Sequence, residues 1–330
     1  VPMAFFDDAV FPAFTDVTST FYPDPNPEST SVDGYIGSDR VAWSTAQSGG
    51  AVSPGGVSDD GSLLVLGINS SDGSSYEILR VFTLFDTSAL PDIGVISAAT
   101  ISLYVQAKTA TTYSHSFGLV TCTPASNTGL VTGDFSQVGT TQQATAIATG
   151  SITTSAYNGW AMTTLSNISK TGISKFAFRV VNDITNSQPS GSGTSQLNIS
   201  SSEVSGTSQD PKIVVTHTDP PADPTNASAT SANGSQHIIV TWTDNASDEN
   251  EYHVERSNDG STGWSDISGA LPANTTSYDD NVGAWSTTRY YRVRALKTSS
   301  GDYSNYTSVV SATTAPAAPT CGGTPAAVAA

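Results

Sequence analysis

The sequence is poor in basic residues. Its 330 residues contain 12 Lys and Arg against 29 Asp and Glu, which gives a formal net charge of -17. Only 12% of the residues are charged, against roughly 25% in a typical globular domain, so the acidity comes from a shortage of cations. Nucleic-acid binding requires a basic stripe that displaces phosphate counterions. The densest basic alternation, Arg289 to Lys297, lies inside an expected strand, and we therefore expect no nucleic-acid partner.

Cysteine is scarce and long apolar runs are missing. Cys122 and Cys321 lie in different segments, which excludes a zinc-ligand spacing and a dense disulfide framework. Whether these two cysteines pair is left open. No run approaches the ~18 apolar residues that would predict a membrane span, and the sequence begins at Val1 without the basic n-region of a signal peptide.

The signatures of catalysis are also missing. A nucleophilic hydrolase would need a Gly-x-Ser-x-Gly elbow with a His base, and the sequence contains no such elbow. The four histidines, His115, His217, His237 and His253, are isolated in sequence, and we expect the last two at the surface of strands. Adjacent acidic residues on a strand point to opposite faces, so they cannot form the paired carboxylates of a glycosidase. We predict a protein without enzymatic activity.

Calcium is the one cofactor that the acidic loops could bind. Three oxygen-rich loops supply the candidates, which are Asp59, Asp60, Asp72, Asp244 and Asp248. None of these loops has the ligand spacing of an EF-hand. Asp-Gly sequences are also common hairpin turns, which gives the same residues a purely structural interpretation.

The last hundred residues contain six or seven short strand-like runs between Pro, Asn and Gly turns. The runs HIIVTWTD, YHVERS, SYDD and YYRVRA have the spacing of a two-sheet fold. Together with Trp242 and Trp264, they make residues 224–314 resemble a fibronectin type III domain. Arg289 stands where that family usually has a corner tyrosine, and Tyr290 or Tyr291 is the expected substitute. Such domains are mostly spacers and contact surfaces, and a fold alone does not fix a function.

A second all-β unit is expected between residues 32 and 218. It contains eight to ten candidate strands, among them SLLVLGINS, YEILRVFTLFDT, ATISLYVQAKT and SKFAFRVV, a number that suits a jelly-roll sandwich. From Tyr76 to Thr218 the sequence resembles jelly-roll domains of the DNRLRE and carbohydrate-binding-module type. Some of those relatives bind glycans, although the shared motif contains no ligand-binding residue. The expected fold class is all-β, a jelly-roll β-sandwich followed by a fibronectin type III (immunoglobulin-like) β-sandwich.

The remaining segments connect or flank these units. Residues 219–223 form a Pro-rich linker, residues 315–330 a Pro/Ala-rich tail, and residues 1–31 an extended N-terminal arm. The arm is too apolar for a free tail, since it carries Phe5, Phe6, Phe11 and Phe14. One interpretation is an edge strand and strap on its own domain. The other is an arm that adds a strand to a neighbouring subunit.

A glycan site on a β-sandwich usually contains exposed aromatic rings with polar groups at the rim. The candidates in the larger unit are Tyr157 and Asn158, expected in an exposed turn, and Trp43. Trp160 is expected in the core.

These observations lead to two functional hypotheses. The first is a non-enzymatic extracellular structural or adhesive protein, a subunit of a filament or virion surface that self-associates by strand addition through its arm. The second is a glycan-binding accessory region of a larger polysaccharide-acting or adhesive protein. Low Lys, abundant Ser, Thr and Gly, and the fibronectin-like segment favour an extracellular, cell-surface or virion-surface location.

Overall fold

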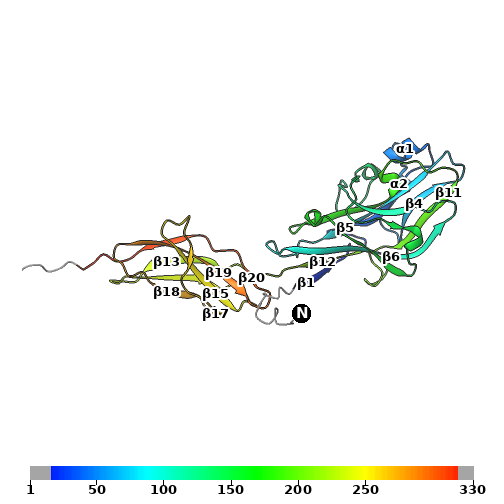
Figure 1. Cartoon of the computed structure of the whole chain (residues 1–330). Helices are drawn as coiled ribbons and strands as arrows, with labels where there is room; N and C mark the ends of the chain where they lie inside the picture. The colour runs from blue at the N-terminus through cyan, green and yellow to red at the C-terminus, as the bar shows by residue number, and fades with distance from the viewer. Residues whose placement is uncertain (1–15, 319–330) are drawn as a thin grey trace, which may run out of the picture. The chain divides into compact units, whose positions relative to one another are not determined.

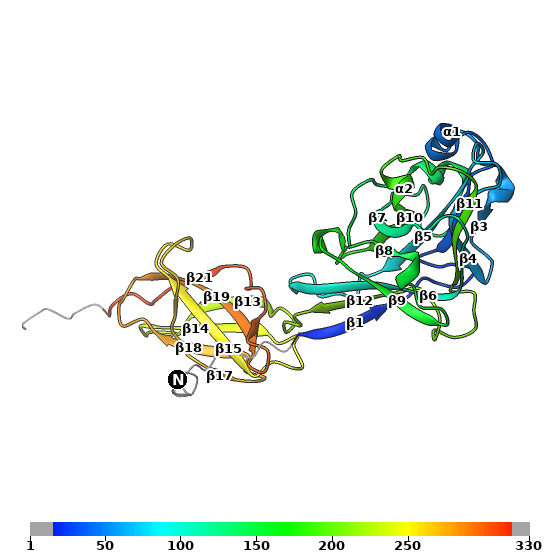
Figure 2. The ribbon, with the colours of Figure 1, turned by 45° about the vertical axis from the view of Figure 1, so that its right-hand side comes forward.

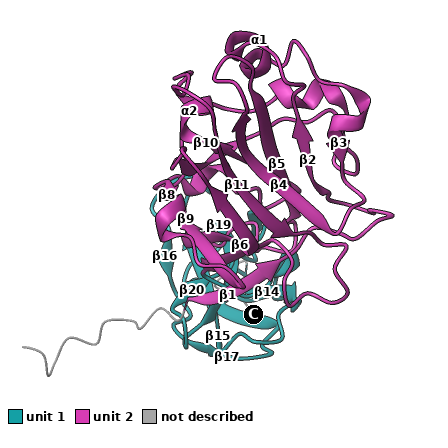
Figure 3. Cartoon of the chain, turned by 90° about the vertical axis from the view of Figure 1, so that its right-hand side faces the viewer, with its two compact units in different colours: residues 1–15, 218–330 teal, residues 16–217 magenta. Residues whose placement is uncertain are grey.

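A computed structural model describes residues 16–318 of the protein. The four phenylalanines of the expected arm and Cys321 lie outside the described residues. The chain divides into two compact units, Asp16–His217 and a second unit whose described part is residues 218–318. Figure 3 shows the larger unit in magenta and the smaller in teal.

The larger unit is a single antiparallel sheet of 12 strands that curls around one core (Figure 1). The strand order is β1-β12-β6-β11-β4-β5-β10-β7-β8, with β2 and β3 joined through β5, and β9 paired with β6. The strands are β1 Val17–Phe21, β2 Asp33–Gly37, β3 Val57–Ser58, β4 Leu63–Ser70, β5 Glu77–Asp86, β6 Ile96–Ala110, β7 Ser116–Thr121, β8 Ile147–Ala148, β9 Ala156–Ala161, β10 Ile173–Val180, β11 Gly193–Ser200 and β12 Lys212–His217.

The helices of this unit are short. They are α1 Trp43–Ser48, α2 Val181–Ile184 and the 3-10 turns η1 Pro54–Gly56, η2 Thr132–Ser136, η3 Thr149–Ser151 and η4 Leu165–Asn167. Nowhere between residues 16 and 318 is a helix long and apolar enough to cross a membrane.

The central strands are buried on both faces, which explains their near-continuous apolar sequence. In β5, eight of ten residues are buried, and β10 pairs with both β5 and β7. Gly67 in β4 faces Ser195 so closely that an added Cβ would lie 2.5 Å from the Ser195 carbonyl oxygen. A side chain at this position would therefore separate β4 from β11.

A buried ion cluster fastens loops to this core. Asp183 of α2 accepts hydrogen bonds from both Arg80 of β5 and Arg179 of β10, with N–O distances of 2.6 to 3.0 Å. Arg80 also donates to the carbonyl oxygens of Phe135 and Gln47 at 2.5 and 2.7 Å. Burial alone would raise the pKa of Asp183, but the two guanidinium groups outweigh burial and hold it below its usual range. The cluster ties α1, η2 and α2 to the sheet.

Strand β1 lies at one end of the strand order and belongs to the segment predicted as an arm. It pairs antiparallel with β12, from Val17 opposite His217 to Phe21 opposite Ile213. The Ser19 hydroxyl lies 2.9 Å from the His217 ring. Within the described residues, the outer edge of β1 has no strand partner, so its backbone forms an open sheet edge.

The smaller unit consists of two antiparallel sheets, one of β13-β14-β18 and one of β16-β15-β19-β20 with β17 and β21 (Figure 2). Its strands are β13 Thr225–Ser231, β14 His237–Thr243, β15 Glu251–Ser257, β16 Ser265–Asp266, β17 Leu271–Pro272, β18 Ser277–Asn281, β19 Thr288–Lys297, β20 Asp302–Tyr303 and β21 Val310–Thr313. Residues from both sheets form its core, including Trp242 of β14 and Tyr252 of β15. Residues 225–313 thus form a fibronectin type III-like sandwich, and the all-β fold class is confirmed.

The position of the missing corner tyrosine has a structural substitute. Tyr291 is fully buried, and its hydroxyl donates to the Asp280 carboxylate at 2.7 Å. Asp280 also accepts from Arg256 Nη1 at 2.9 Å. Of the two expected substitutes, Tyr291 therefore forms the buried hydrogen bond that joins β19 to β18.

The Pro-rich linker is held against the smaller unit. Lys297 Nζ lies 3.1 Å from Asp219 Oδ2 and 2.7 Å from Asp248 Oδ2. The Asp223 carboxylate accepts from the Asn305 backbone amide at 2.7 Å and from its side chain at 3.1 Å. These contacts fix the linker to the domain that follows it.

Candidate functional site

A polar hollow of about 310 Å³ opens on the larger unit beside β2 and β5. Strand β2 contributes Tyr35, the following loop contributes Asp39 and Arg40, and β5 contributes Glu77 and Leu79. The β2–β5 register, with Gly37 opposite Leu79, brings these side chains to one place.

The wall of the hollow depends on a close backbone approach. The 3-10 turn η1 packs against β2 so tightly that an added Cβ at Gly56 would lie 2.5 Å from the Gly37 carbonyl oxygen. Ser53, directly before η1, donates its hydroxyl to Asp39 Oδ2 at 2.7 Å. The turn therefore orients the Asp39 carboxylate.

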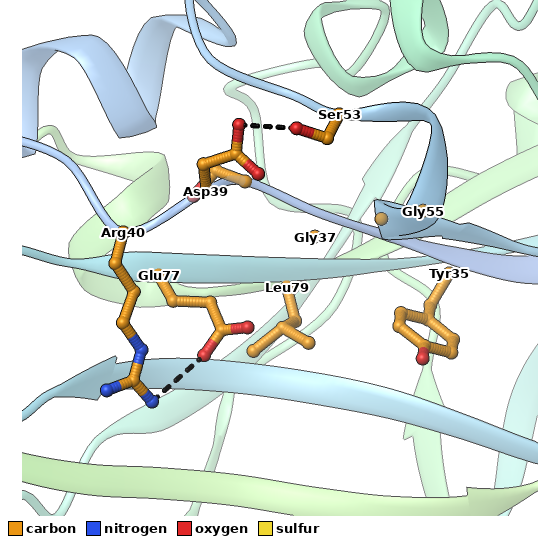
Figure 4. A pocket seen from close by; sticks show the side chains of 10 residues that line it. Tyr35, Gly37, Asp39, Arg40, Ser53, Gly55, Glu77 and Leu79 are labelled. Atoms are coloured by element: carbon orange, nitrogen blue, oxygen red, sulfur yellow. Dashed lines mark hydrogen bonds and ion pairs between the residues drawn. The ribbon is translucent and has the colours of Figure 1, made fainter.

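Figure 4 shows the charged groups at one end of the hollow and Tyr35 at the other, with Leu79 between them. Arg40 Nη2 lies 3.4 Å from Glu77 Oε2, and the same oxygen accepts from Asn69 Nδ2 at 3.1 Å. One aromatic ring with hydroxyl, carboxylate and guanidinium groups around a shallow floor is an arrangement that suits a hydroxyl-rich ligand.

The residues expected to bind a glycan lie elsewhere. Trp43 is buried, and its Nε1 donates to Asn186 Oδ1 at 2.9 Å. The prediction that Asn158 is exposed was wrong, because it is buried in β9 and its amide bonds to Thr153 backbone atoms at 2.8 and 2.9 Å. Tyr157 is half-buried, and Lys212 Nζ lies 3.9 Å from its ring centroid. The three residues do not form a common surface, and Trp160 lies in the core as predicted.

The candidate calcium ligands serve in turns and ion pairs. Asp72 accepts from the Ser75 and Ser74 amides at 2.7 and 2.8 Å, and these bonds hold its pKa below the usual range. The Leu130 amide donates to Asp59 at 2.7 Å. Asp244 accepts from the Ala246 amide and the Tyr252 hydroxyl, and Asp248 pairs with Lys297. Asp60 is exposed. Within the described part of the chain, no group of three or more His, Cys, Asp or Glu residues could hold a metal ion.

The smaller unit carries a continuous stack of aromatic rings and guanidinium groups on the face of β15 and β19. Arg292 lies 4.4 Å from the Trp264 ring centroid and 3.7 Å from that of Tyr306. Arg294 lies 4.7 Å from the Tyr306 centroid and 3.8 Å from that of Tyr303. His253 completes the stack edge-on against Tyr303, with centroids 5.7 Å apart.

One buried carboxylate holds this stack from below. Glu255 accepts from Arg292 at 2.5 Å and from the Tyr306 hydroxyl at 2.5 Å, and it lies 3.3 Å from Arg294 Nη2. Cation–π contacts are worth roughly 0.5–2 kcal/mol each. Since guanidinium groups occupy the ring faces, the stack reinforces the sheet and leaves few free ring faces for a ligand.

The expected surface position of His253 was wrong. It is buried, with Nδ1 2.7 Å from Asp266 Oδ2 and Nε2 3.3 Å from Glu251 Oε2. His237 does lie at the surface and pairs with Asp279 at 2.9 Å.

Neither the polar hollow nor the stack was predicted from the sequence. The hollow joins residues more than 40 positions apart, and no local motif marks it. The sequence does contain a pattern that could have indicated the stack. Arg292 and Arg294 alternate on one face of a strand, and Tyr303 and Tyr306 follow them. Long planar side chains on one face of paired strands are close enough to stack.

No family model matches the chain, and no curated protein matches it. Among solved structures, an Fn3-like protein from Clostridium thermocellum is 27% identical, with 29% of this chain and 95% of that one covered and a TM-score of 0.26. A human fibronectin type III domain is 21% identical, with 32% of this chain and 92% of that one covered and a TM-score of 0.24. A beta-1,2-glucanase from Parabacteroides distasonis is 13% identical, with 90% of this chain and 39% of that one covered and a TM-score of 0.25. Nothing about function follows from likenesses of this size.

Proposed function

We propose that the protein is a non-enzymatic extracellular structural or adhesive subunit that self-associates through the Phe-rich segment before Asp16. The observation that carries the proposal is the position of β1. Among residues 16–318, the strand that follows this segment has no strand partner on its outer side, and an open edge can accept a further strand.

In strand addition, the backbone and the side chains of the segment would have different roles. Backbone hydrogen bonds along the edge would supply affinity. Apolar side chains at alternate positions would fix the register, because a slip by one residue turns every side chain to the other face. Phe5, Phe6, Phe11 and Phe14 are the proposed anchors. The low content of Lys and the two β units suit a protein exposed on a cell, filament or virion surface.

The experiment is electron microscopy and sedimentation of the full chain beside a variant that lacks residues 1–15. The deletion stops before Val17 because β1 pairs with β12 of its own sheet and its loss would destabilise the unit. A variant that lacks residues 319–330 is the matched control. Ordered assemblies of the full chain and the control, absent from the first variant, are expected. If the variant without residues 1–15 still assembles, the proposal that this segment joins the subunits is refuted.

The polar hollow favours a second candidate function, glycan binding. On this alternative the larger unit is a jelly roll of the DNRLRE or carbohydrate-binding-module type in a longer polysaccharide-acting or adhesive protein. Tyr35, Asp39, Arg40 and Glu77 would replace the glycan residues predicted from sequence. A glycan array with the full chain and Tyr35→Ala tests it, with Tyr104→Ala as the control on another strand. We expect only Tyr35→Ala to lose glycan binding. Equal binding by all three proteins would refute the hollow as the glycan-binding site.

A further inference from the structure

An apolar groove of about 400 Å³ lies at the start of β6, between the turn that leads into this strand and η4. Its lining includes Ile93, Val95, Ile96, Leu165, Ile168 and Lys170. Val95 is 65% exposed, which is unusual for a large apolar side chain in this protein. Ile168 is buried. Lys170 Nζ donates to the Gly94 carbonyl oxygen at 3.0 Å and so joins the two sides.

The sheet register places this groove at the end of the sheet where Asp16, the first described residue, lies. Val17, the first residue of β1, lies opposite His217, and His217 lies opposite Ile96, the first residue of β6. The Ser97 hydroxyl donates to the Asp16 carboxylate. Since neighbouring strands lie about 4.8 Å apart, residue 16 and the groove share one end of the sheet.

The segment before Asp16 has a composition complementary to the groove. Phe5 and Phe6 are followed directly by Asp7 and Asp8. An aromatic side chain matches the apolar lining, and the two carboxylates match the ammonium group of Lys170, which has three donors. Fifteen residues span up to about 50 Å when extended, enough to reach from one copy of the protein to another.

We propose that this groove is the acceptor for the Phe6–Asp8 part of residues 1–15 of a second copy. The inference rests on the proposed self-association and names the groove that receives one of its aromatic anchors. Phe6 occupies the apolar part of the groove while Asp7 and Asp8 face Lys170. Donor segment and acceptor groove are different surfaces of one chain, so the contact is heterologous and generates an open polymer unless the rotation closes a ring.

The test uses two variants that each lack one half of the contact. Val95→Asp places a charge in the groove but keeps the segment, and deletion of residues 1–15 removes the segment but keeps the groove. Each variant is expected to sediment as a monomer, and an equimolar mixture is expected to form a 1:1 pair. Val131→Asp, at another exposed valine (53%), is the matched control and should assemble like the natural chain.

A charge swap keeps the test valid if Val95→Asp folds poorly. Lys170→Glu should weaken assembly at least ~10-fold, a loss of about 1.4 kcal/mol, and Asp7→Lys with Asp8→Lys in the same chain should restore it. If Val95→Asp and Lys170→Glu assemble like the natural chain while deletion of residues 1–15 abolishes assembly, the groove is not the acceptor. The proposed function would still stand. A mixture that stays monomeric would overturn docking between copies. A natural chain that never assembles would overturn both proposals.

Discussion

Arg80 and Asp183 form a doubly hydrogen-bonded ion pair in the core of the larger unit, with N–O distances of 2.6 and 2.8 Å. Asp183 also neutralises Arg179, so one carboxylate serves two buried cations. Removal of one partner from a buried pair leaves an uncompensated charge and typically costs 3–5 kcal/mol.

We therefore expect Asp183→Asn to lower the free energy of unfolding of the larger unit by about 3–5 kcal/mol. Denaturant-dependent hydrogen exchange of peptides from residues 16–217 measures this change without interference from the smaller unit. Glu77→Gln, which disrupts the exposed pair with Arg40, is the control and should cost less than about 1 kcal/mol. Equal losses in the two variants would contradict the role of the cluster.

The stability of the larger unit should depend on Asp33, the first residue of β2. Burial raises the pKa of Asp33 to about 7. The hydrogen bonds that Ser202 donates favour the ionised form, but they only partly offset burial. The unfolded chain has the ordinary value of 3.8, so the folded state binds more protons between about pH 4 and pH 7. Stability is therefore highest below this window, falls as the pH rises through it and levels off above pH 7.

We expect the natural chain to be more stable at pH 5 than at pH 8 by about 2 kcal/mol. Asp33→Asn should remove most of this difference. Asp210 should account for the remaining slope, because burial raises its pKa to about 6. Thermal unfolding of both proteins across this range provides the measurement, and parallel curves would show that Asp33 does not titrate in the window.

Arg292→Lys should destabilise the smaller unit by about 1–3 kcal/mol. Lysine keeps the charge but loses the planar group that lies between Trp264 and Tyr306 and donates two hydrogen bonds to Glu255. Arg289→Lys is the matched control, since the Arg289 guanidinium donates to the neighbouring Thr288 carbonyl. Denaturation should separate the two variants, and equal stability would mean that the stack contributes nothing.

Cys122 should be unreactive in the folded protein. Its thiol is free and buried, and burial raises its pKa well above the usual range; the thiolate is the reactive form. In a Cys321→Ser background, a maleimide at pH 8 should label Cys122 only after denaturant is added. Rapid labelling without denaturant would show that β7 opens readily at its end.

The sequence predicted the elements whose pattern is local. Alternating apolar residues in HIIVTWTD and YHVERS predicted β14 and β15, and the apolar run YEILRVFTLFDT predicted β5. Trp160 was assigned to the core because it belongs to the candidate strand NGWAMTTLS. Turn chemistry at Asp72 also followed from local sequence, since an Asp side chain bonds to the amides that follow it.

The candidate sites depended on pairings that no local pattern records. Trp43 and Asn158 resemble exposed sugar-binding residues in sequence, yet both are buried and hydrogen-bonded within the larger unit. His253 was expected at the surface, and alternation on β15 does not reveal that Asp266 of β16 and Tyr303 of β20 lie against its ring.

The sequence by itself determined that this protein is all-β, acidic and built from two units, because composition and strand periodicity act over a few residues. Only the tertiary structure decided that β1 closes onto β12, that Asp183 neutralises two arginines, and that an apolar groove lies beside the start of β6. Each of these depends on strand register between residues far apart in the chain. Register is set by the burial of whole faces rather than by any one segment.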